Sequence, residues 1–285
     1  MDLGPGNAII QKGKGSKVMW SRASRIVRSS LSGFETLRRF VRFLLQHVSS
    51  SKIRGSIMRI VYSNYEPFVT RVFTTLLEDG MTVLDIGAAW GYYSSLAATK
   101  VGPEGHVIAF EADPLNFQAL LKTVKASKST NITPVPFAVS SVNGIFGFYS
   151  TGVFGNSSLH YSTRHERKFL VKTVRLDDFL TPNTKVGLIK MDIDGSELFA
   201  FNGMTRLVQS NQRIKIITEF CPRLLVKAGS NPREYLVTLI DYGFNIFHID
   251  EHRNQLVARC IDQLLTISSS RAIMLLCIRS KHQSA

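Results

Sequence analysis

The chain has 285 residues, of which 44% are hydrophobic, and it carries a formal net charge of +14. This length can bury one sizeable core, whereas no stretch approaches the roughly 18 consecutive apolar residues of a membrane span. The N-terminus also lacks the charged segment and apolar run of a secretory signal, so we expect a soluble, cytoplasmic protein. The odd number and wide spacing of Cys221, Cys260 and Cys277 exclude a disulfide framework and a metal-ligand spacing, and we expect all three to be small core residues.

The positive charge is concentrated in residues 1–60, which we interpret as an extension ahead of a catalytic domain at 61–285. Twelve Lys or Arg residues stand there against Asp2 and Glu35, a net of +10, which leaves +4 for the rest of the chain. Weak apolar periodicity predicts that most of the first thirty residues are disordered or loosely helical.

A basic amphipathic helix is predicted within this extension, over residues 32–48. Ser32 and Glu35 have the spacing of a capping box, and Arg38, Arg39 and Arg42 lie to one side of an apolar face made of Phe34, Leu37, Phe40, Val41, Leu44, Leu45 and Val48. Such a helix docks on the globular domain, or binds a membrane surface or an acidic partner. The first 33 residues are also Ser- and Arg-rich, so an organellar transit peptide stays open as an alternative.

From residue 62 the sequence alternates between helical and strand patterns, which is typical of a parallel sheet covered on both faces. We predict helices over 67–78, 91–100, 196–208 and 233–242 and from Pro114, and strands over 81–86, 106–110, 132–139, 186–191, 214–218, 244–249 and 272–278. The last two strands are expected to be joined by a loop. The predicted fold class is α/β, with a doubly wound, mostly parallel seven-stranded sheet and one antiparallel strand near its edge.

Residues 144–180 interrupt this alternation and predict a β insertion. Two strands, Ile145–Tyr149 and Phe169–Val174, are expected to pair around a polar loop, and such insertions often carry substrate contacts. The loop contains residues that can act as a base or a substrate donor or can simply face solvent: Asn156, Ser157, Ser158, His160 and His165.

A glycine turn follows the first strand, in Val83-Leu84-Asp85-Ile86-Gly87-Ala88-Ala89-Trp90-Gly91. Gly87 and Gly91 allow a ligand to approach the backbone, and we expect backbone N–H groups to face the sheet's carboxyl edge. A dinucleotide is not expected, because the other two fingerprint positions hold Ala89 and Tyr92. Asp85 would repel a pyrophosphate but can accept hydrogen bonds from an ammonium group. Trp90 serves packing or substrate stacking.

The next strand ends in Phe110-Glu111-Ala112-Asp113-Pro114, which places a carboxylate 20 residues beyond Gly91. An acid at this spacing can hold both hydroxyls of a ribose. Glu111 and the glycine turn together predict a ligand with a ribose and an amino group but no phosphate, and S-adenosylmethionine meets these requirements.

Five motifs in this order resemble the FkbM family of methyltransferases over about residues 62–250: Tyr65-Glu66-Pro67; Val83 to Ala88 with Gly91-Tyr92-Tyr93-Ser94; Phe110 to Pro114; Val174-Arg175-Leu176-Asp177-Asp178-Phe179; and Ile189-Lys190-Met191-Asp192-Ile193-Asp194-Gly195-Ser196-Glu197-Leu198. The resemblance implies a class I, Rossmann-like methyltransferase fold with S-adenosylmethionine as cofactor. It also implies O-methylation of a hydroxyl on a sugar, glycan or other small molecule.

The resemblance also implies which residues bind the cofactor. Asp85, Gly87 and Gly91 would line the methionine end and Glu111 the ribose, and Ala88 and Ala112 belong to the same two motifs. Ala138 and Val139, at the end of the third strand, would line the adenine. Glu66 resembles a position that closes over the cofactor, with helix capping as the alternative. Asp194 departs from the family, which usually has Glu before the glycine, and this puts the contact of that position in doubt.

An acidic cluster, Asp192, Asp194 and Glu197, is expected at the end of the fourth strand beside the cofactor's methyl group. Methyl transfer to a hydroxyl needs positioning and a base, and Asp192 is our candidate for that base. Alternatively, Asp192 orients the cofactor's amino group or caps the helix that starts near Gly195. The three carboxylates could instead gather a divalent cation, although we expect no metal.

Two other functions compete with a small-molecule or glycan methyltransferase. The +10 extension supplies phosphate affinity and suggests an RNA methyltransferase, although few aromatic residues accompany its basic ones. A methyltransferase-like binding module, anchored by the basic helix, is the non-enzymatic alternative; the intact glycine and acidic positions speak against it.

Overall fold

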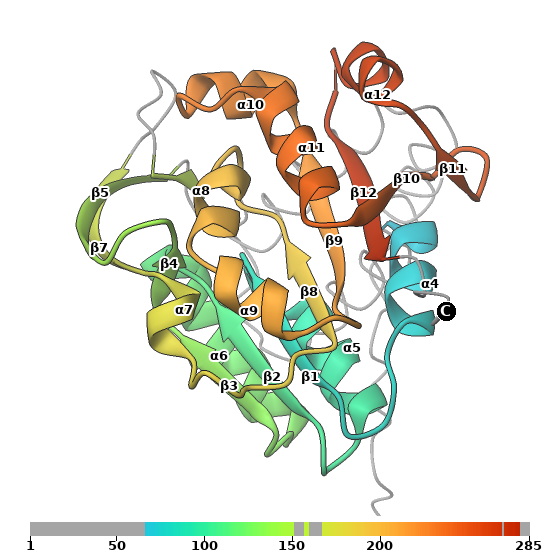
Figure 1. Ribbon diagram of the computed structural model, residues 1–285. Coiled ribbons are helices and arrows are strands. Elements are labelled where there is room, and N and C mark those ends of the chain that lie inside the picture. The colour runs from blue at the N-terminus through green and yellow to red at the C-terminus, as the bar shows by residue number, and fades with distance from the viewer. Residues whose placement is uncertain (1–65, 151–156, 160–166, 270, 280–285) are drawn as a thin grey trace, which may run out of the picture. The chain divides into compact units, whose positions relative to one another are not determined.

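An eight-stranded sheet organises the part of the chain that the computed structural model describes, residues 66–150, 157–159, 167–269 and 271–279 (Figure 1). These residues belong to one compact unit that starts at Glu66. The basic extension with its helix at 32–48 lies outside the described residues, as do Asn156, His160 and His165. Within the described residues, no helix is long and apolar enough to cross a membrane.

The strand order of this sheet is β11-β10-β12-β9-β8-β1-β2-β3. Five strands are mutually parallel at its centre and one side: β1 (Thr82–Ile86), β2 (His106–Phe110), β3 (Ile132–Val135), β8 (Leu188–Met191) and β9 (Lys215–Phe220). β12 (Ile273–Arg279) runs antiparallel between β9 and β10 (Phe244–Asp250). The predicted doubly wound, mostly parallel sheet is confirmed.

The eighth strand, β11 (Gln255–Ala258), pairs antiparallel with β10 at the sheet's edge. The connection between the last two predicted strands therefore holds β11 and helix α12 (Ile261–Ile267), and the expected simple loop was wrong. Both elements are short, and β11 is largely exposed, so neither carries a clear apolar period. Cys221 and Cys277 are buried as expected, whereas Cys260 is exposed at the start of α12, so its assignment to the core was also wrong.

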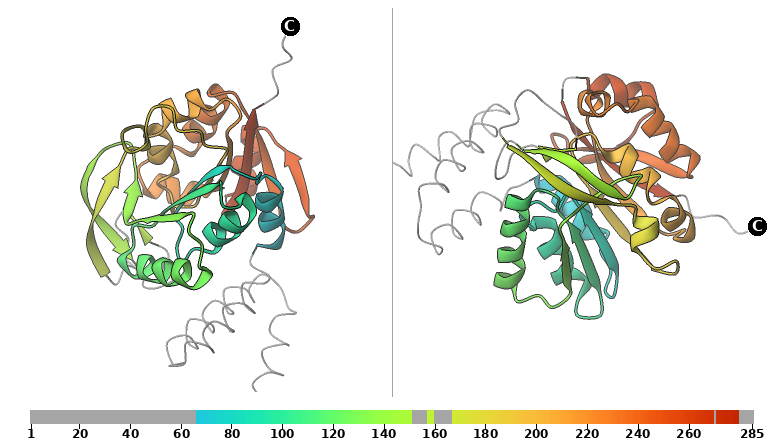
Figure 2. Two further views of the ribbon diagram at one scale, coloured as in Figure 1. Left: turned by 90° about the horizontal axis from the view of Figure 1, so that it is seen from below. Right: turned by 90° about the vertical axis from the view of Figure 1, so that its left-hand side faces the viewer.

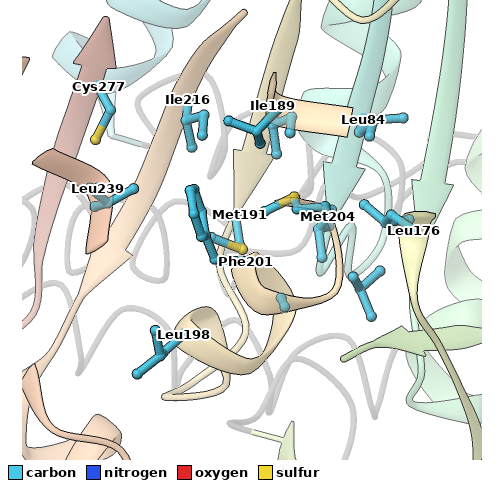
Figure 3. Packing of buried hydrophobic residues seen from close by; sticks show 14 of the residues in the cluster. Leu84, Leu176, Ile189, Met191, Leu198, Phe201, Met204, Ile216, Leu239 and Cys277 are labelled. Atoms are coloured by element: carbon cyan, nitrogen blue, oxygen red, sulfur yellow. The ribbon is translucent and has the colours of Figure 1, made fainter. Parts of the chain in front are cut away.

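Helices cover both faces of the sheet (Figure 2). One face carries α5 (Tyr92–Val101) and α6 (Pro114–Ser127), with α4 (Pro67–Thr75) packed against α5. The other carries α8 (Glu197–Asn202), α9 (Thr205–Ser210) and α11 (Pro232–Asp241), and α7 (Leu176–Phe179) and α10 (Pro222–Lys227) are single turns or little more. Figure 3 shows the core on this second face, where Leu84, Ile189 and Met191 of the strands meet Leu198 and Phe201 of α8.

The helix predicted over 196–208 is divided into α8 and α9. The division falls at Gly203, where a Cβ atom would collide with the carbonyl oxygen of Ser140. The carbonyl of Gly203 also accepts a 2.9 Å hydrogen bond from the N–H of Asp177. Contacts with residues far away in the sequence thus override the local helical pattern.

A second, four-stranded sheet has the order β4-β7-β5-β6. β5 (Gly144–Ser150) pairs antiparallel with β7 (Arg167–Val174), which confirms the paired strands of the insertion, and β6 is Ser157–Ser158. The strand predicted over 132–139 is divided at Pro136, because β4 (Phe137–Val139) leaves β2 and pairs with β7 instead. Proline has no N–H to contribute to a sheet, which suits it to the point where the strand changes partners.

Candidate active site

The glycine turn after β1 is shaped by the protein's own backbone. Gly87, Ala89 and Gly91 all have positive φ angles, of 83°, 49° and 89°. A Cβ on Gly87 would collide with the carbonyl oxygen of Asp192. Gly87 is therefore required by the close approach of two loops at the sheet's carboxyl edge, a requirement separate from ligand access.

The backbone N–H groups of this turn are already used within the chain. Those of Gly87 and Ala88 both donate to the carbonyl oxygen of Phe110 at 2.9 Å, and that of Gly91 donates to Ala88 at 2.8 Å. These three amides are therefore satisfied within the chain, and the cofactor contacts of Gly87, Ala88 and Gly91 stay a prediction. The side chains around it are the groups that can hold a cofactor.

Asp85 lies on β1 with only 2% of its surface exposed. Its Oδ2 accepts a 2.5 Å hydrogen bond from the Ser94 hydroxyl of α5. Burial raises the pKa of the Asp85 carboxyl, and the Ser94 hydrogen bond and the charge of Lys190 oppose that rise. A nearby cationic group would favour the ionised carboxylate, as expected for a residue that binds an ammonium group.

Lys190 is a fully buried cation, although the sequence analysis gave it no role. It stands opposite Asp85 in the β1–β8 register, and its Nζ lies 3.0 Å from Oδ2 of Asp192 and 4.9 Å from the centroid of the Tyr93 ring. Burial alone lowers the pKa of Lys190, but the attractions of Asp192, Glu66 and Asp85 outweigh it and raise that pKa. A lysine inside an otherwise apolar strand was the sequence signal that could have identified it.

Glu66 contacts the same cluster through Tyr93, whose hydroxyl donates a 2.9 Å hydrogen bond to Oε2 of Glu66. The side chain of Glu66 makes no capping hydrogen bond to α4. Glu251 instead accepts the amides of Phe68 and Val69 at the start of that helix. The capping alternative for Glu66 was therefore wrong, and its position beside the Lys190 cluster is compatible with the cofactor role.

Glu111 stands directly after β2, beside the glycine turn. Its two carboxylate oxygens accept 2.7 Å hydrogen bonds from the amides of Ala89 and Asp113. Burial nevertheless raises the pKa of Glu111 to about 8. Each oxygen keeps a second lone pair, so the carboxylate can still accept hydrogen bonds from two ribose hydroxyls. Ala112 is half-buried and packs against the small core of the second sheet.

Ala138 and Val139 lie in a different place from the one expected. The third strand of the main sheet ends at Val135, and these two residues belong to β4 of the second sheet. Both are buried, Ala138 against Phe148 and Val171. Their assignment to the end of the third strand was wrong, and their adenine contact stays a prediction.

The acidic cluster separates into distinct environments. Glu197 is buried and accepts the amides of Ile193 and Gly195, and burial raises its pKa to about 7. Asp194 occupies the left-handed region with φ of 52°. The side chain of Asp192 is 29% exposed, and α8 begins at Glu197 with Ser196 as its N-cap residue. Glu197 rather than Asp192 therefore holds the amides of this turn.

Other candidate residues have more ordinary surroundings. Trp90 is half-buried, with its ring centroid 5.5 Å from that of Tyr92. Within the described residues, no group of three His, Cys, Asp or Glu side chains could hold a metal ion. The divalent-cation alternative for the acidic cluster thus has no support there.

Glu219, on β9, is an acid that the sequence analysis missed. Its Oε2 is buried without a hydrogen-bond partner. Burial, followed by the charges of Asp192, Asp194 and Glu197, raises the pKa of Glu219 well above its ordinary value. A glutamate near the end of a predicted buried strand was the available signal.

The comparisons with known proteins agree with this geometry. Residues 85–246, more than half of the chain, match the family described as "Methyltransferase FkbM domain". The chain belongs to the FkbM family of S-adenosylmethionine-dependent methyltransferases.

Among the relatives is the hexuronic acid methyltransferase AglP of Haloferax volcanii, 28% identical over 171 residues, which are 59% of this chain and 66% of that one. A ribosomal RNA large subunit methyltransferase E of Chromohalobacter salexigens is 56% identical over only 45 residues, 16% of this chain and 20% of the relative. The FkbM chain thus spans just under two thirds of the first relative and a fifth of the second.

Among solved structures, a putative rRNA-methylase from Clostridium thermocellum has a TM-score of 0.46 and 12% identity, over 75% of this chain and 94% of that one. At this TM-score the likeness carries no argument about substrate.

The residues of the FkbM site fit the chemistry of S-adenosylmethionine, the cofactor of the family. Asp85 provides a carboxyl group for an amino group, and Glu111 provides two oxygens for ribose hydroxyls. Buried acids close to one another are suited to a cationic ligand without phosphate, because a phosphate would be repelled.

Proposed function

We propose that this FkbM protein transfers a methyl group from S-adenosylmethionine to a hydroxyl oxygen of a sugar, glycan or other small molecule. The observation that carries the proposal is the order of carboxyl groups along the sheet's edge. Glu111 follows β2, Asp85 lies on β1 and Asp192 follows β8, and these three strands are neighbours in the sheet. A partly exposed acid therefore stands beside the residues suited to the cofactor.

When bound, S-adenosylmethionine supplies an electrophilic methyl group on a sulfonium. Glu111 would hold the ribose and Asp85 the amino group, while Glu66 and the Tyr93 hydroxyl lie beside the Lys190 cluster. Asp192 would accept the proton that the acceptor hydroxyl loses as its oxygen takes the methyl group. Lys190, 3.0 Å away, fixes the Asp192 carboxylate in place and offsets the charge of its acidic neighbours.

A sugar acceptor is favoured by the archaeal relative, which is named for a hexuronic acid. The β insertion stands where it can contribute acceptor contacts, because β5 ends at Ser150, which binds Asp113 beside the cofactor residues. Substrate contacts from this insertion stay a prediction.

The test compares wild-type protein with Asp192→Asn in a methyl-transfer assay that measures S-adenosylhomocysteine formation with neutral and acidic sugars. General-base catalysis typically contributes about 10²–10⁴-fold in rate, so we expect turnover to fall by at least about 100-fold in Asp192→Asn. Binding of S-adenosylmethionine, measured by calorimetry, should change much less. Asp178→Asn, which alters an exposed carboxyl, is the control. Undiminished turnover in Asp192→Asn would contradict the assignment of the base.

An RNA acceptor is the second candidate, because residues 1–60 carry a net charge of +10 and a short segment matches a ribosomal RNA methyltransferase. A salt-sensitive gel shift with RNA, together with methylation of that RNA, would favour this candidate over a sugar. Binding to lipid vesicles without any affinity for S-adenosylmethionine would instead favour a non-catalytic binding module.

A further inference from the structure

Glu219 is a half-buried acid to which the proposed mechanism gives no task. It is near the carboxyl end of β9, and its Oε2 is enclosed by the protein without a hydrogen-bond partner. Leaving a buried carboxyl oxygen unpaired costs free energy, so such a group in a folded protein calls for an explanation. One explanation is a ligand that supplies the missing hydrogen-bond partner.

The strand registers place Glu219 on the same face of the sheet as Asp192. Asp85 pairs with Lys190 across β1 and β8, and Lys190 pairs with Ile217 across β8 and β9. Side chains two residues apart on a strand point to the same side. Asp192 follows Lys190 by two residues, and Glu219 follows Ile217 by two. Both side chains therefore extend from the face of the sheet that carries Asp85 and Lys190, at its carboxyl edge.

The strand order also places Glu219 relative to the residues of the proposed reaction. Along the edge, Glu111 of the ribose site comes first, then Asp85, then Asp192, and Glu219 comes last. The cofactor residues occupy the ends of β2 and β1, so the end of β9 is the part of the edge beside Asp192 that they leave to an acceptor. Glu219 is on that side.

A second buried polar group in this region also has no partner. Ser196 is 3% exposed, and its hydroxyl, in the turn between Asp192 and α8, makes no hydrogen bond. Burial and the neighbouring carboxylates raise the pKa of Glu219, which favours its neutral form. A neutral carboxyl can both donate and accept, which suits it to another hydroxyl group.

We propose that Glu219 is an acceptor-binding residue and that, with Asp192 and Ser196, it selects an uncharged polyol with adjacent hydroxyl groups, such as a neutral sugar. This proposal rests on the proposed function and deepens it. One hydroxyl gives its proton to Asp192 while its neighbour exchanges hydrogen bonds with Glu219. A carboxylate on the acceptor is disfavoured, because it would face the like charges of Asp192 and Asp194. This class differs from the hexuronic acid named for the archaeal relative.

The experiment titrates full-length protein, loaded with S-adenosylhomocysteine, with 4-nitrophenyl β-D-glucopyranoside and with the corresponding glucuronide. Loss of the Glu219 hydrogen bonds should weaken glucoside binding about tenfold in Glu219→Ala. Glu219→Gln, which keeps a neutral donor and acceptor, should stay within about threefold of wild type, since it preserves those bonds. Glu234→Ala, which removes an exposed carboxyl from α11, is the control, and the glucuronide should bind about tenfold more weakly than the glucoside.

The proposal is overturned if Glu219→Ala binds the glucoside as tightly as wild type, if the glucuronide binds more tightly, or if neither probe binds. Affinity for S-adenosylmethionine, measured on the same proteins without S-adenosylhomocysteine, separates this failure from failure of the proposed function. Wild-type protein that does not bind the cofactor contradicts the proposed function itself. If wild type, Glu219→Ala, Glu219→Gln and Glu234→Ala bind the cofactor equally, and Glu219→Ala binds the glucoside as tightly as wild type, only the role of Glu219 is contradicted.

Discussion

The hydroxyl of Ser150 donates a 2.5 Å hydrogen bond to Oδ2 of Asp113, and this bond joins the end of β5 to the start of α6. Both side chains are fully buried. Oδ1 of Asp113 accepts the amide of Leu115 in the first turn of α6, and the Asp113 amide donates to Glu111. The β insertion is thereby coupled through two hydrogen bonds to the carboxylate that we assign to the ribose.

Ser150→Ala removes one hydrogen bond from the buried Asp113 carboxylate. A hydrogen bond to such a group contributes about 1.5–3 kcal/mol, so we expect the free energy of unfolding to fall by about that amount. Cofactor affinity should fall too, because Asp113 positions Glu111. Urea denaturation and calorimetry check both effects. Ser127→Ala, at the exposed end of α6, should change neither, and equal effects of the two variants would contradict the coupling.

Much of this fold was predictable because apolar periodicity and turn residues report directly on local structure. The parallel strands around Asp85 and Lys190, the N-cap at Asp113 and the paired strands of the insertion all carry such local signals. The division at Gly203 was not predictable, since it depends on contact with Ser140, more than sixty residues earlier. The division at Pro136 likewise depends on β4 pairing with β7.

The location of a candidate site residue was predictable where a single sequence motif places that residue at the end of a strand. Asp85 and Glu111 lie at the strand ends that their motifs indicate, and the structure brings both to the same edge. Lys190 and Glu219 were missed because their surroundings come from several strands. Only the register shows that they lie on the same face as Asp85, and only packing shows that Lys190 and the Oε2 atom of Glu219 are buried.

Gly87→Ala tests the close approach of the two loops at the active site. A Cβ there would collide with the Asp192 carbonyl in addition to the strain of a positive φ, so we expect a loss of more than about 2 kcal/mol in unfolding free energy and loss of cofactor binding. Gly80→Ala is a matched control, because Gly80 also has a positive φ, of 73°, but no heavy atom within 4 Å of its Cβ position. Only the backbone strain of about 1–2 kcal/mol should remain in that variant. Similar losses in both would show that Asp192 imposes no constraint.

Glu111→Gln should alter how stability depends on pH. Burial raises the pKa of Glu111 from 4.5 to about 8, so the folded protein holds this proton more tightly than the unfolded chain does. Its contribution to stability is fully present below about pH 4.5 and is lost as pH rises through about 8. Gln does not titrate, so the unfolding free energy of wild type relative to Glu111→Gln should fall by about 4 kcal/mol between pH 5 and pH 8.5.

Urea denaturation of ligand-free protein across that pH range measures this difference. Glu234→Gln alters an exposed carboxyl of α11 and should give a difference from wild type that stays constant. A constant difference for Glu111→Gln as well would mean that Glu111 is ionised throughout the range.

Lys190→Met replaces the buried ammonium with a side chain of similar length. Asp192 loses its ion-pair partner and Asp85 loses a nearby positive charge, so two acids become uncompensated. Breaking a buried ion pair costs about 3–5 kcal/mol, and because the Asp192 side chain is 29% exposed, solvent screening should reduce this to about 2–4 kcal/mol. Denaturant titration of Lys190→Met, Asp192→Asn and the double variant measures it.

The double variant should lose less stability than the sum of the two single variants, since the neutral amide that Asp192→Asn introduces no longer needs a cation. Lys215→Met is the control, because Lys215 pairs with the largely exposed Glu78 and such a pair contributes about 0–1 kcal/mol. If Lys190→Met lost no more stability than Lys215→Met, Lys190 would contribute only the packing of its aliphatic chain. The carboxylates of the active site would then have to be held in place by their hydrogen bonds to Ser94, Tyr93 and the backbone.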